Sequence, residues 1–352
     1  MGERRPLASG DYGPRRLSIE LTNICNLHCS YCLRDEDALY HTPANFLSAE
    51  LLQTIFRRGR EVMGLTNVGF TGGEPTLHPK FAQVLETVAN EGLKCSFVTN
   101  GWHFERIWPT VLAHRDSITH IAFSLDGATR EDHDYWRGDG SFVRLVRAFS
   151  RCYGNSIPFT FRVTLRPDTA AKLEQLAMFA ARMGASSLSF SYVFPTSPDE
   201  VSLDPDERSR IEQEIANLAK IFKMRIDLNV GYHNIDPSAP CSPLAGASAN
   251  IDYRGRLTLC CNLSGFRGAA GDKDIIAELD KEDFAQAYER LRAVAEEQMA
   301  ARSVRLSQFA EQGIKPDLYT ASPCLFCLES FGKLPWRSAG DTSGIRALPV
   351  LA

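Results

Sequence analysis

Three cysteines lie close together near the start of the chain. Their spacing places Cys25, Cys29 and Cys32 on one loop that follows a short strand-like run. Three thiolates do not fill a four-coordinate structural zinc site. They can bind three irons of a 4Fe-4S cluster and leave the fourth iron open to another ligand, which would make that iron a reaction site. The alternative is a zinc loop that is completed by His28, Asp35 or a distant cysteine.

Short polar segments follow three of the predicted strands, at the edge where barrel enzymes build their sites. These segments are residues 71–75, 99–101 and 124–127. In the first of them, Gly72 and Gly73 let the backbone approach a ligand closely. Glu74 follows, and its carboxylate can accept a hydrogen bond from an ammonium group. The segments therefore predict a binding site beside the cysteine loop.

Together these patterns resemble the signature of the radical S-adenosylmethionine (SAM) enzymes. The resemblance rests on the cysteine spacing, on Tyr31 before the last cysteine, and on the Gly-Gly-Glu turn. It implies that the open iron binds the amino and carboxylate groups of SAM. One electron then cleaves SAM to a 5′-deoxyadenosyl radical, which abstracts hydrogen from a substrate. The expected cofactors are a 4Fe-4S cluster and SAM, and an electron donor such as flavodoxin or ferredoxin is an expected partner.

The same resemblance assigns SAM contacts to individual residues. These are Tyr31, Gly72, Gly73, Glu74, Asn100, Ser124 and Arg162. The Gly-Gly-Glu turn is expected to bind the methionine amino group. Ser124 and Asn100 are expected to contact the ribose or the methionine carboxylate. Arg162 is expected to bind that carboxylate, with Arg166 as a competing candidate and a surface salt bridge as the alternative explanation.

A second group of cysteines lies in the C-terminal third of the chain. Its members are Cys241, Cys260, Cys324 and Cys327. Four thiolates can form a closed metal site. Their spacing, with Gly255 between the first two, resembles the twitch domain, a shortened SPASM domain that carries one auxiliary 4Fe-4S cluster. This resemblance extends over about residues 16–330, and a structural zinc ion is the alternative.

Cys261 directly follows Cys260 and makes the choice of ligand ambiguous, since successive strand residues face opposite ways. The spacing of the resembled family favours Cys260 as the ligand. Cys261 is then either a buried inert thiol or a hydrogen-atom donor that quenches a substrate radical, as epimerases of that family require.

The elements that must position these residues follow a repeated βα pattern from residue 16 to about residue 194. The expected strands are residues 17–21, 67–70, 94–98, 120–124, 159–165 and 187–193. The expected helices between them are residues 48–63, 79–92, 104–114, 141–153 and 170–183. Phe159, Phe161 and Val163 alternate as strand residues do. The expected fold class is therefore α/β, with a partial (β/α)6 barrel of the TIM type.

A small α+β twitch domain with a β-hairpin is expected after the barrel. Residues 195–199 are typical of a linker, and residues 204–222 are predicted to form a helix. A hairpin is expected from residues 249–252 and 257–261, followed by a helix at about 282–300 and a loop-like tail. The expected division is an N-terminal extension (1–15), the barrel (16–195), a linking helix and strand (196–235), the twitch domain (236–330) and a tail (331–352).

Composition excludes several classes of partner. The chain has 39 Lys and Arg against 43 Asp and Glu, a net charge of −4, without a basic run. Neither a nucleic acid nor an anionic membrane surface is therefore an expected partner. No apolar run is long enough to span a membrane, and the first residues do not form an export signal. The expected location is the cytoplasm.

The expected reaction is the oxidation, crosslinking or epimerisation of a ribosomally made peptide. Residues 132–134 and 136–138 resemble the "HD…RG" turn of peptide-modifying members of the family, and a plain surface turn is the alternative. Because only a short segment precedes the first strand, a separate peptide-recognition protein is an expected partner.

Other reactions remain open from the sequence. The first alternative function is that of a small-molecule dehydrogenase or epimerase that acts on a sugar or aminocyclitol. A remote alternative is a non-catalytic iron–sulfur scaffold. Cyclisation of a nucleotide is less expected, because the chain ends without the Gly-Gly tail of that group. A substrate radical also needs a base, and the candidates by position are Asp35, Glu36, Asp37, His103 and Asp126.

Overall fold

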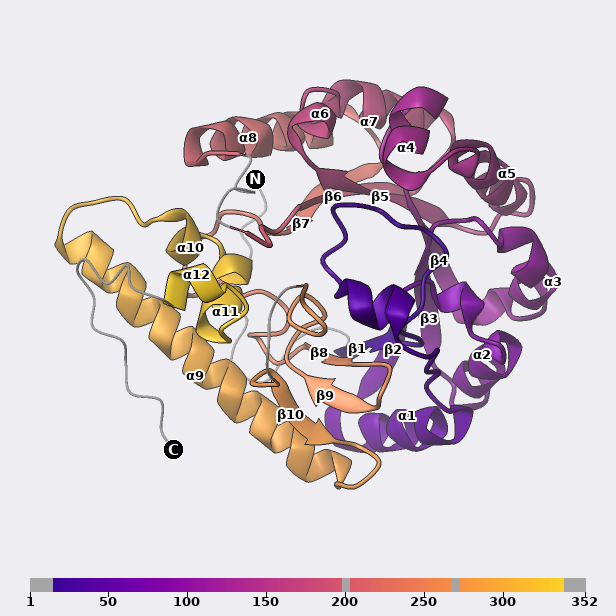
Figure 1. The fold of residues 1–352 in the computed structure, drawn as a ribbon, viewed down its shortest axis with the longest axis horizontal. Coiled ribbons are helices and arrows are strands. Elements are labelled where there is room, and N and C mark those ends of the chain that lie inside the picture. Colours follow the sequence, from indigo (N-terminus) through magenta and orange to yellow (C-terminus); the bar gives the residue numbers. More distant parts are fainter. Residues whose placement is uncertain (1–14, 198–202, 268–271, 339–352) are drawn as a thin grey trace.

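A computed structural model describes residues 15–197, 203–267 and 272–338, and these residues form one sheet surrounded by helices (Figure 1). The strand order is β10-β9-β8-β1-β2-β3-β4-β5-β6-β7. The first seven strands are β1 (Arg15–Glu20), β2 (Leu65–Thr71), β3 (Lys94–Thr99), β4 (Ile118–Ser124), β5 (Phe159–Leu165), β6 (Ser187–Tyr192) and β7 (Arg225–Val230). They run parallel and curve around an open centre. The expected α/β partial barrel is confirmed.

Helices cover the outer face of this sheet (Figure 1). They are α1 (Ala49–Met63), α2 (Phe81–Asn90), α3 (Phe104–Ala113), α4 (Arg130–Arg137), α5 (Ser141–Gly154), α6 (Pro167–Ala170), α7 (Leu173–Arg182) and α8 (Pro205–Ile221). The short turns η1 (Asp37–His41), η2 (Pro75–Leu77) and η3 (Arg115–Ser117) lie in the connections between strands and helices. Helix α1 begins where the Ser48 side chain accepts from a backbone N–H, and it ends at Gly64 in the left-handed conformation. Its buried Leu52, Ile55 and Phe56 face the sheet, and each contributes roughly 1.5–3 kcal/mol.

The two faces of the barrel strands differ in chemistry. On β5, Phe159 and Phe161 are buried and contact Phe149 of α5 at ring-centroid distances of 5.7 and 5.3 Å. Arg162 lies between Phe161 and Val163 and therefore faces the inside of the barrel, in register with Ser124 on β4. Polar inward-facing residues leave this interior open to ligands, unlike the packed interior of a closed TIM barrel.

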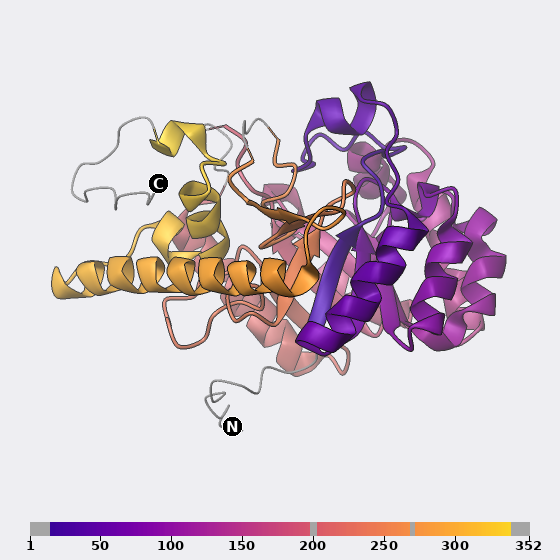
Figure 2. The same cartoon turned by 90° about the horizontal axis from the view of Figure 1, so that it is seen from below.

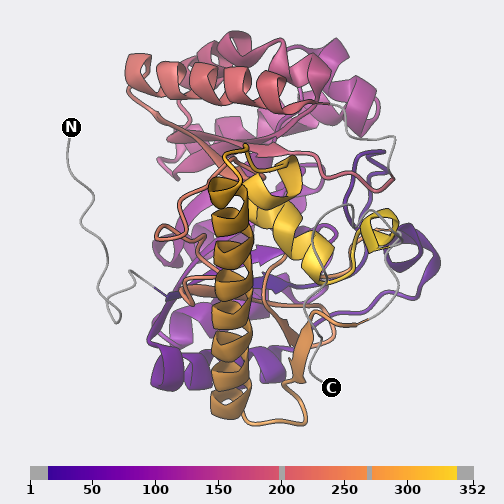
Figure 3. The same cartoon turned by 90° about the vertical axis from the view of Figure 1, so that its left-hand side faces the viewer.

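The C-terminal part continues the same sheet instead of forming a separate one. β8 (Ser248–Ile251) lies parallel beside β1, and β9 (Arg256–Thr258) and β10 (Ile275–Glu278) follow in antiparallel order. Gly255 makes the expected hairpin turn with a φ of 82°. Helix α9 (Phe284–Glu311) runs along this side of the molecule and projects past it (Figures 2 and 3). None of the described helices, α9 included, combines the length and apolar character needed to cross a membrane.

Some expected elements differ from the structure. Helix α9 continues to residue 311 instead of ending near residue 300, and the loop-like tail instead contains α10 (Leu318–Ala321), α11 (Pro323–Ser330) and α12 (Pro335–Ser338). The turn expected at residues 132–138 belongs to helix α4, which Thr129 caps and Gly138 ends. These short or weakly amphipathic helices have little apolar periodicity for a sequence to reveal. Residues 1–14, 198–202 and 339–352, from the expected extension, linker and tail, lie outside the described residues.

Candidate active site

A pocket opens at the carboxyl edge of strands β1 to β4. It encloses about 580 Å³, a volume that includes the open solvent at its mouth. Its lining includes the predicted residues Cys25, Cys29, Cys32, Tyr31, Gly72, Gly73, Glu74, Asn100 and Ser124. Arg162 is not part of the lining, whereas Arg137, to which the sequence assigned no contact, is. One pocket therefore joins the cysteine loop to six of the seven expected SAM contacts.

The Gly-Gly-Glu turn packs directly against the backbone that leads into the cysteine loop. Gly73 N donates to Thr22 O at 3.0 Å, and Glu74 N donates to Ile24 O at 2.8 Å. A Cβ added to Gly73 would lie 1.9 Å from Ile24 O, and one added to Gly72 would lie 2.5 Å from Thr22 O. The glycines are thus required for contact with the cysteine loop, in addition to any approach to a ligand.

Glu74 is held as a buried hydrogen-bond acceptor. Its Oε1 accepts from the hydroxyls of Thr76 at 2.7 Å and Thr99 at 2.8 Å, and its Oε2 accepts from Asn100 N at 2.8 Å. Burial raises the pKa of Glu74, while these hydrogen bonds favour the charged form. Oε2 keeps a lone pair for a further donor, as the expected contact with an ammonium group requires.

The side chain of Asn100 joins the cysteine loop to β3. Its Oδ1 accepts from Trp102 N at 2.9 Å, and its Nδ2 donates to Asn26 Oδ1 at 3.1 Å. This leaves Asn26 Nδ2, next in sequence to Cys25, buried without an acceptor in the protein. A buried unpaired donor beside a thiol is expected where a ligand supplies the missing acceptor.

The electrostatics of the three thiols fit an iron–sulfur cluster. Burial raises the pKa of Cys25 to about 12, with smaller effects from Glu74 and the other two thiols. Burial also raises the pKa of Cys29. Three thiolates in so desolvated a place need a cationic group to bind them, and a cluster binds each thiol through a different iron. Within the described ranges, no three His, Cys, Asp or Glu side chains are placed to hold one metal ion together, as the zinc alternatives require.

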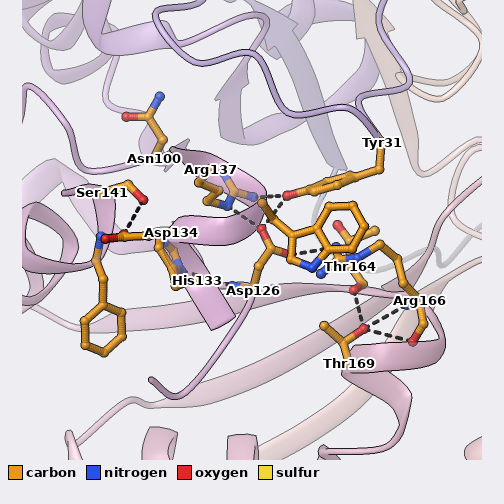
Figure 4. A network of polar contacts seen from close by, with 12 residues as sticks. Tyr31, Asn100, Asp126, His133, Asp134, Arg137, Ser141, Thr164, Arg166 and Thr169 are labelled. Carbon is orange, nitrogen blue, oxygen red and sulfur yellow. Dashed lines mark hydrogen bonds and ion pairs between the residues drawn. The ribbon is translucent and has the colours of Figure 1, made fainter. Parts of the chain in front are cut away.

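Asp126 forms the centre of a buried ionic network beside this pocket (Figure 4). Arg166 pairs with it at 3.0 Å, Arg137 pairs with it through Nε, and the Tyr31 hydroxyl donates to it. Arg137 Nη2 also donates to the Tyr31 hydroxyl at 2.7 Å. Although burial acts to raise it, the two guanidiniums hold the pKa of Asp126 below its ordinary value. Both cations stabilise the carboxylate form and so weaken Asp126 as a base; its expected role as a candidate base stays a prediction.

The "HD…RG" segment has structural roles that a surface turn would not have. His133 and Asp134 are buried. Asp126 N donates to His133 Nδ1 at 3.2 Å, and Asp134 accepts from Phe142 N at 2.7 Å and from the Ser141 hydroxyl at 2.9 Å. The segment thus joins β4 to α5 and positions Arg137 at the pocket wall.

The two arginines of β5 and its end have different surroundings. Arg166 pairs with Asp126 and with Asp168, at 3.0 and 3.2 Å, so its guanidinium is already engaged. Arg162 is exposed on the inner face of the barrel; partial desolvation lowers its pKa, and Cys261 and Asp227 oppose that effect. The expected contact of Arg162 with SAM stays a prediction.

None of the other four base candidates lines this pocket, whereas Glu20, an acid that the sequence did not single out, has a pKa in the range of a base. Asp35, Glu36, Asp37 and His103 are absent from the lining. Glu20, at the end of β1, is buried and pairs with Arg34 at 3.0 Å. Burial raises its pKa to about 7, which is the range of a general base.

The cysteine loop is hydrogen-bonded to the segment that directly follows Cys260 and Cys261. Asp35 N donates to Gly265 O at 2.9 Å, and Arg267 N donates to Leu33 O at 2.7 Å. Arg34 also donates to the carbonyl of Ser264. The two cysteine regions therefore belong to one folded unit, although they are far apart in the sequence.

Arg302 of α9 holds together the backbone around the second group of thiols. It donates to the carbonyls of Thr320 at 3.1 Å and Ala321 at 3.3 Å, and to that of Asn234. These carbonyls precede Cys324 and Cys241 in the chain. Burial raises the pKa of Cys324 to about 12, and Cys241 adds to that shift. No sequence pattern pointed to Arg302.

Cys260 and Cys261 have different neighbours. The pKa of Cys260 is raised because its thiol donates to Cys261 and is buried, with a contribution from Cys324. The hydrogen bond from Cys260 lowers the pKa of Cys261 to about 6, together with Arg34 and Arg162. Arg34 and Arg162 thus act on Cys261, whereas Cys324 interacts with both thiols. The expected roles of these thiols stay predictions.

Comparison with known proteins agrees with this geometry. The family described as the radical SAM superfamily matches residues 19–180. Those residues are a radical SAM domain. Members of the superfamily use a 4Fe-4S cluster and SAM. The mycofactocin maturase MftC of Mycobacterium tuberculosis is 32% identical over 174 residues, which are 49% of this chain and 43% of MftC. The chain spans less than half the length of this relative.

Solved structures resemble the chain beyond the radical SAM domain. Streptococcus suis SuiB bound to its precursor peptide SuiA has a TM-score of 0.64 at 14% identity, covering 80% of this chain and 66% of SuiB. The enzyme anSMEcpe with bound AdoMet has a TM-score of 0.64 at 15% identity, covering 91% of this chain and 96% of that one. At such identities the likeness shows the fold, which therefore extends over the C-terminal part.

Proposed function

We propose that this protein cleaves SAM reductively at the first thiol group and uses the radical to oxidise, crosslink or epimerise a ribosomally made peptide. One observation carries the proposal: a single pocket brings together the three-cysteine loop, the Gly-Gly-Glu turn and Ser124. When bound, the cluster supplies the electron that cleaves SAM, and the resulting radical abstracts hydrogen from the substrate.

The residues of the chain have distinct roles in this proposal. Cys25, Cys29 and Cys32 hold the cluster, and the turn at Gly72 and Gly73 keeps their loop in place. Glu74 Oε2 accepts from the amino group of SAM. Ser124, at the end of β4, lies where it can contact the ribose or carboxylate of SAM.

Two similar proteins support a peptide substrate: MftC is named a maturase, and SuiB has been solved with its precursor peptide bound. The proposal includes an auxiliary 4Fe-4S cluster at Cys241, Cys260, Cys324 and Cys327. It also includes flavodoxin or ferredoxin as electron donor and a separate peptide-recognition protein. Co-expression with short reading frames beside the gene, followed by mass spectrometry, tests the peptide class directly.

We expect Cys29→Ala to abolish 5′-deoxyadenosine formation, because two thiols on the loop do not hold the cluster. Protein purified without oxygen should contain about eight irons per chain, falling to about four in this variant. Cys152→Ala is the matched control, since Cys152 is a buried cysteine in α5. Formation of 5′-deoxyadenosine by Cys29→Ala at the rate of the control would disprove the cluster assignment.

We expect Cys324→Ala to lose about four irons while part of the SAM cleavage remains, because the first thiol group is intact. Modification of the peptide should then fail, since the auxiliary site is proposed to accept an electron or to bind substrate. Iron content, 5′-deoxyadenosine and peptide mass measure the three effects. A normal yield of modified peptide would make the second site dispensable.

A further inference from the structure

Among the described residues that line the pocket of Cys25, Cys29 and Cys32, Arg137 is the one cation. Its side chain is only 11% exposed. Asp126 and the Tyr31 hydroxyl fix its guanidinium, and Tyr31 stands immediately before Cys32. A guanidinium held in this way keeps both its position and its charge in every state of the site.

The buried network around Arg137 contains more positive than negative charge. Asp126 is fully buried, and its carboxylate forms ion pairs with both Arg137 and Arg166. Asp168 also pairs with Arg166, but its side chain is 43% exposed, so water screens that pair. Inside the pocket wall, one carboxylate therefore serves two guanidiniums. An uncompensated charge at such a buried place is costly unless another group of opposite sign lies near it.

The cysteine loop supplies that opposite charge. Arg137 and the three thiols line the same pocket, and Tyr31, to which Arg137 Nη2 donates at 2.7 Å, stands immediately before Cys32. Thiols that bind a metal centre do so as anionic thiolates. The charge of Arg137 thus acts on the ligands of the proposed cluster.

We propose that Arg137 is a positioning residue that raises the reduction potential of the cluster at Cys25, Cys29 and Cys32. Reduction adds one negative charge at this site, and a fixed neighbouring cation stabilises the reduced form. The same guanidinium orients the cysteine loop through Tyr31. This inference rests on the proposed function, since it requires a redox-active cluster at these thiols.

The test is a potentiometric titration of the full chain, purified without oxygen and followed by electron paramagnetic resonance. The signal to follow is the component that changes when SAM is added, because only the first cluster binds SAM. In Arg137→Gln, the ratio of reduced to oxidised cluster at the wild-type midpoint should fall at least tenfold, which is 59 mV for a one-electron couple. Arg137→Lys should restore most of that ratio. Arg130→Gln, an exposed arginine on the same helix, should leave it within about threefold.

Each outcome decides a different question. The inference would be overturned if Arg137→Gln had the reduction potential of the wild type, or if Arg137→Lys lowered the potential as much as Arg137→Gln does. In either case the charge at this position would not set the potential. Absence of any SAM-responsive signal in the wild type would instead overturn the proposed function. If Arg137→Gln holds too little iron, Arg137→Lys alone gives the test, because it keeps the positive charge at this position. Its ratio of reduced to oxidised cluster at the wild-type midpoint should stay within about threefold of the wild-type ratio, and a fall of about tenfold or more would contradict the inference.

Discussion

Gly73→Ala is expected to empty the first thiol site while leaving the outer barrel folded. The added Cβ would lie 1.9 Å from Ile24 O and 3.0 Å from Asn23 O, both backbone atoms that cannot move aside as a side chain does. The turn after β2 and the loop after β1 would have to separate. That separation would break the hydrogen bonds from Gly73 N to Thr22 O and from Glu74 N to Ile24 O. Iron should fall from about eight to about four per chain, and 5′-deoxyadenosine formation should disappear.

Gly154→Ala is the matched control for this experiment. Gly154 lies in the last turn of α5, without a positive φ, and an added Cβ would meet no atom within 4 Å. Alanine there should be neutral or stabilise the fold by less than about 1 kcal/mol, because it restricts the unfolded chain. Full iron content and SAM cleavage by Gly73→Ala would show that the cysteine loop does not depend on this contact.

The part of the site predicted from sequence consists of short consecutive motifs. Cys25, Cys29 and Cys32 occupy one loop, and Gly72 to Glu74 occupy one turn, so their spacing alone implies their chemistry. The repeated βα pattern then places both segments at one edge of a parallel sheet. The strands were predicted for the same reason, since alternation on β5 and continuous apolar runs elsewhere are local features.

The part that could not be predicted depends on long-range contacts. Arg137 and Tyr31 are 106 positions apart, and only the curvature of the sheet brings them together. Helix α4 has only eight residues and is highly polar, and its end signals, Thr129 and Gly138, are also common in turns. Glu20 and Arg302 likewise act through distant partners, since Asn250 is 230 positions from Glu20 and Asn234 is 68 positions from Arg302. The placement of β8 beside β1 joins segments more than 200 positions apart, which no local pattern specifies.

The position of an acidic residue in the sequence also could not show which charged groups surround it. Asp126 ends a strand at the edge where catalytic bases are found, and that position made it a candidate. Its function depends on two guanidiniums and one hydroxyl that reach it from other elements. A carboxylate with such partners is a structural anion, and it holds Tyr31 and Arg137 at the pocket wall. The segment at residues 124–127 therefore contributes to the site through the position and the negative charge of Asp126.

Asp126→Ala is expected to destabilise the protein by about 3–5 kcal/mol, because it leaves two buried guanidiniums without their carboxylate. Urea denaturation at neutral pH measures the loss. Asp168→Ala is the matched control, since Asp168 pairs with the same Arg166 but is 43% exposed, and it should cost less than about 1 kcal/mol. Equal unfolding midpoints for Asp126→Ala and the wild type would refute the role of this carboxylate.

The same carboxylate predicts how stability depends on pH. The pKa of Asp126 is lower in the folded than in the unfolded chain, because Arg137 and Arg166 outweigh the effect of burial. Its contribution is therefore fully present above the unfolded pKa of about 3.9, and it is lost as the pH falls through the folded value. The wild type should consequently lose more stability than Asp126→Ala as acid is added, and the difference between them should narrow. The free energies of unfolding of the wild type and Asp126→Ala could instead differ by a constant amount down to pH values well below the pKa of an ordinary aspartate. The ion pairs of Asp126 would then contribute nothing to folding.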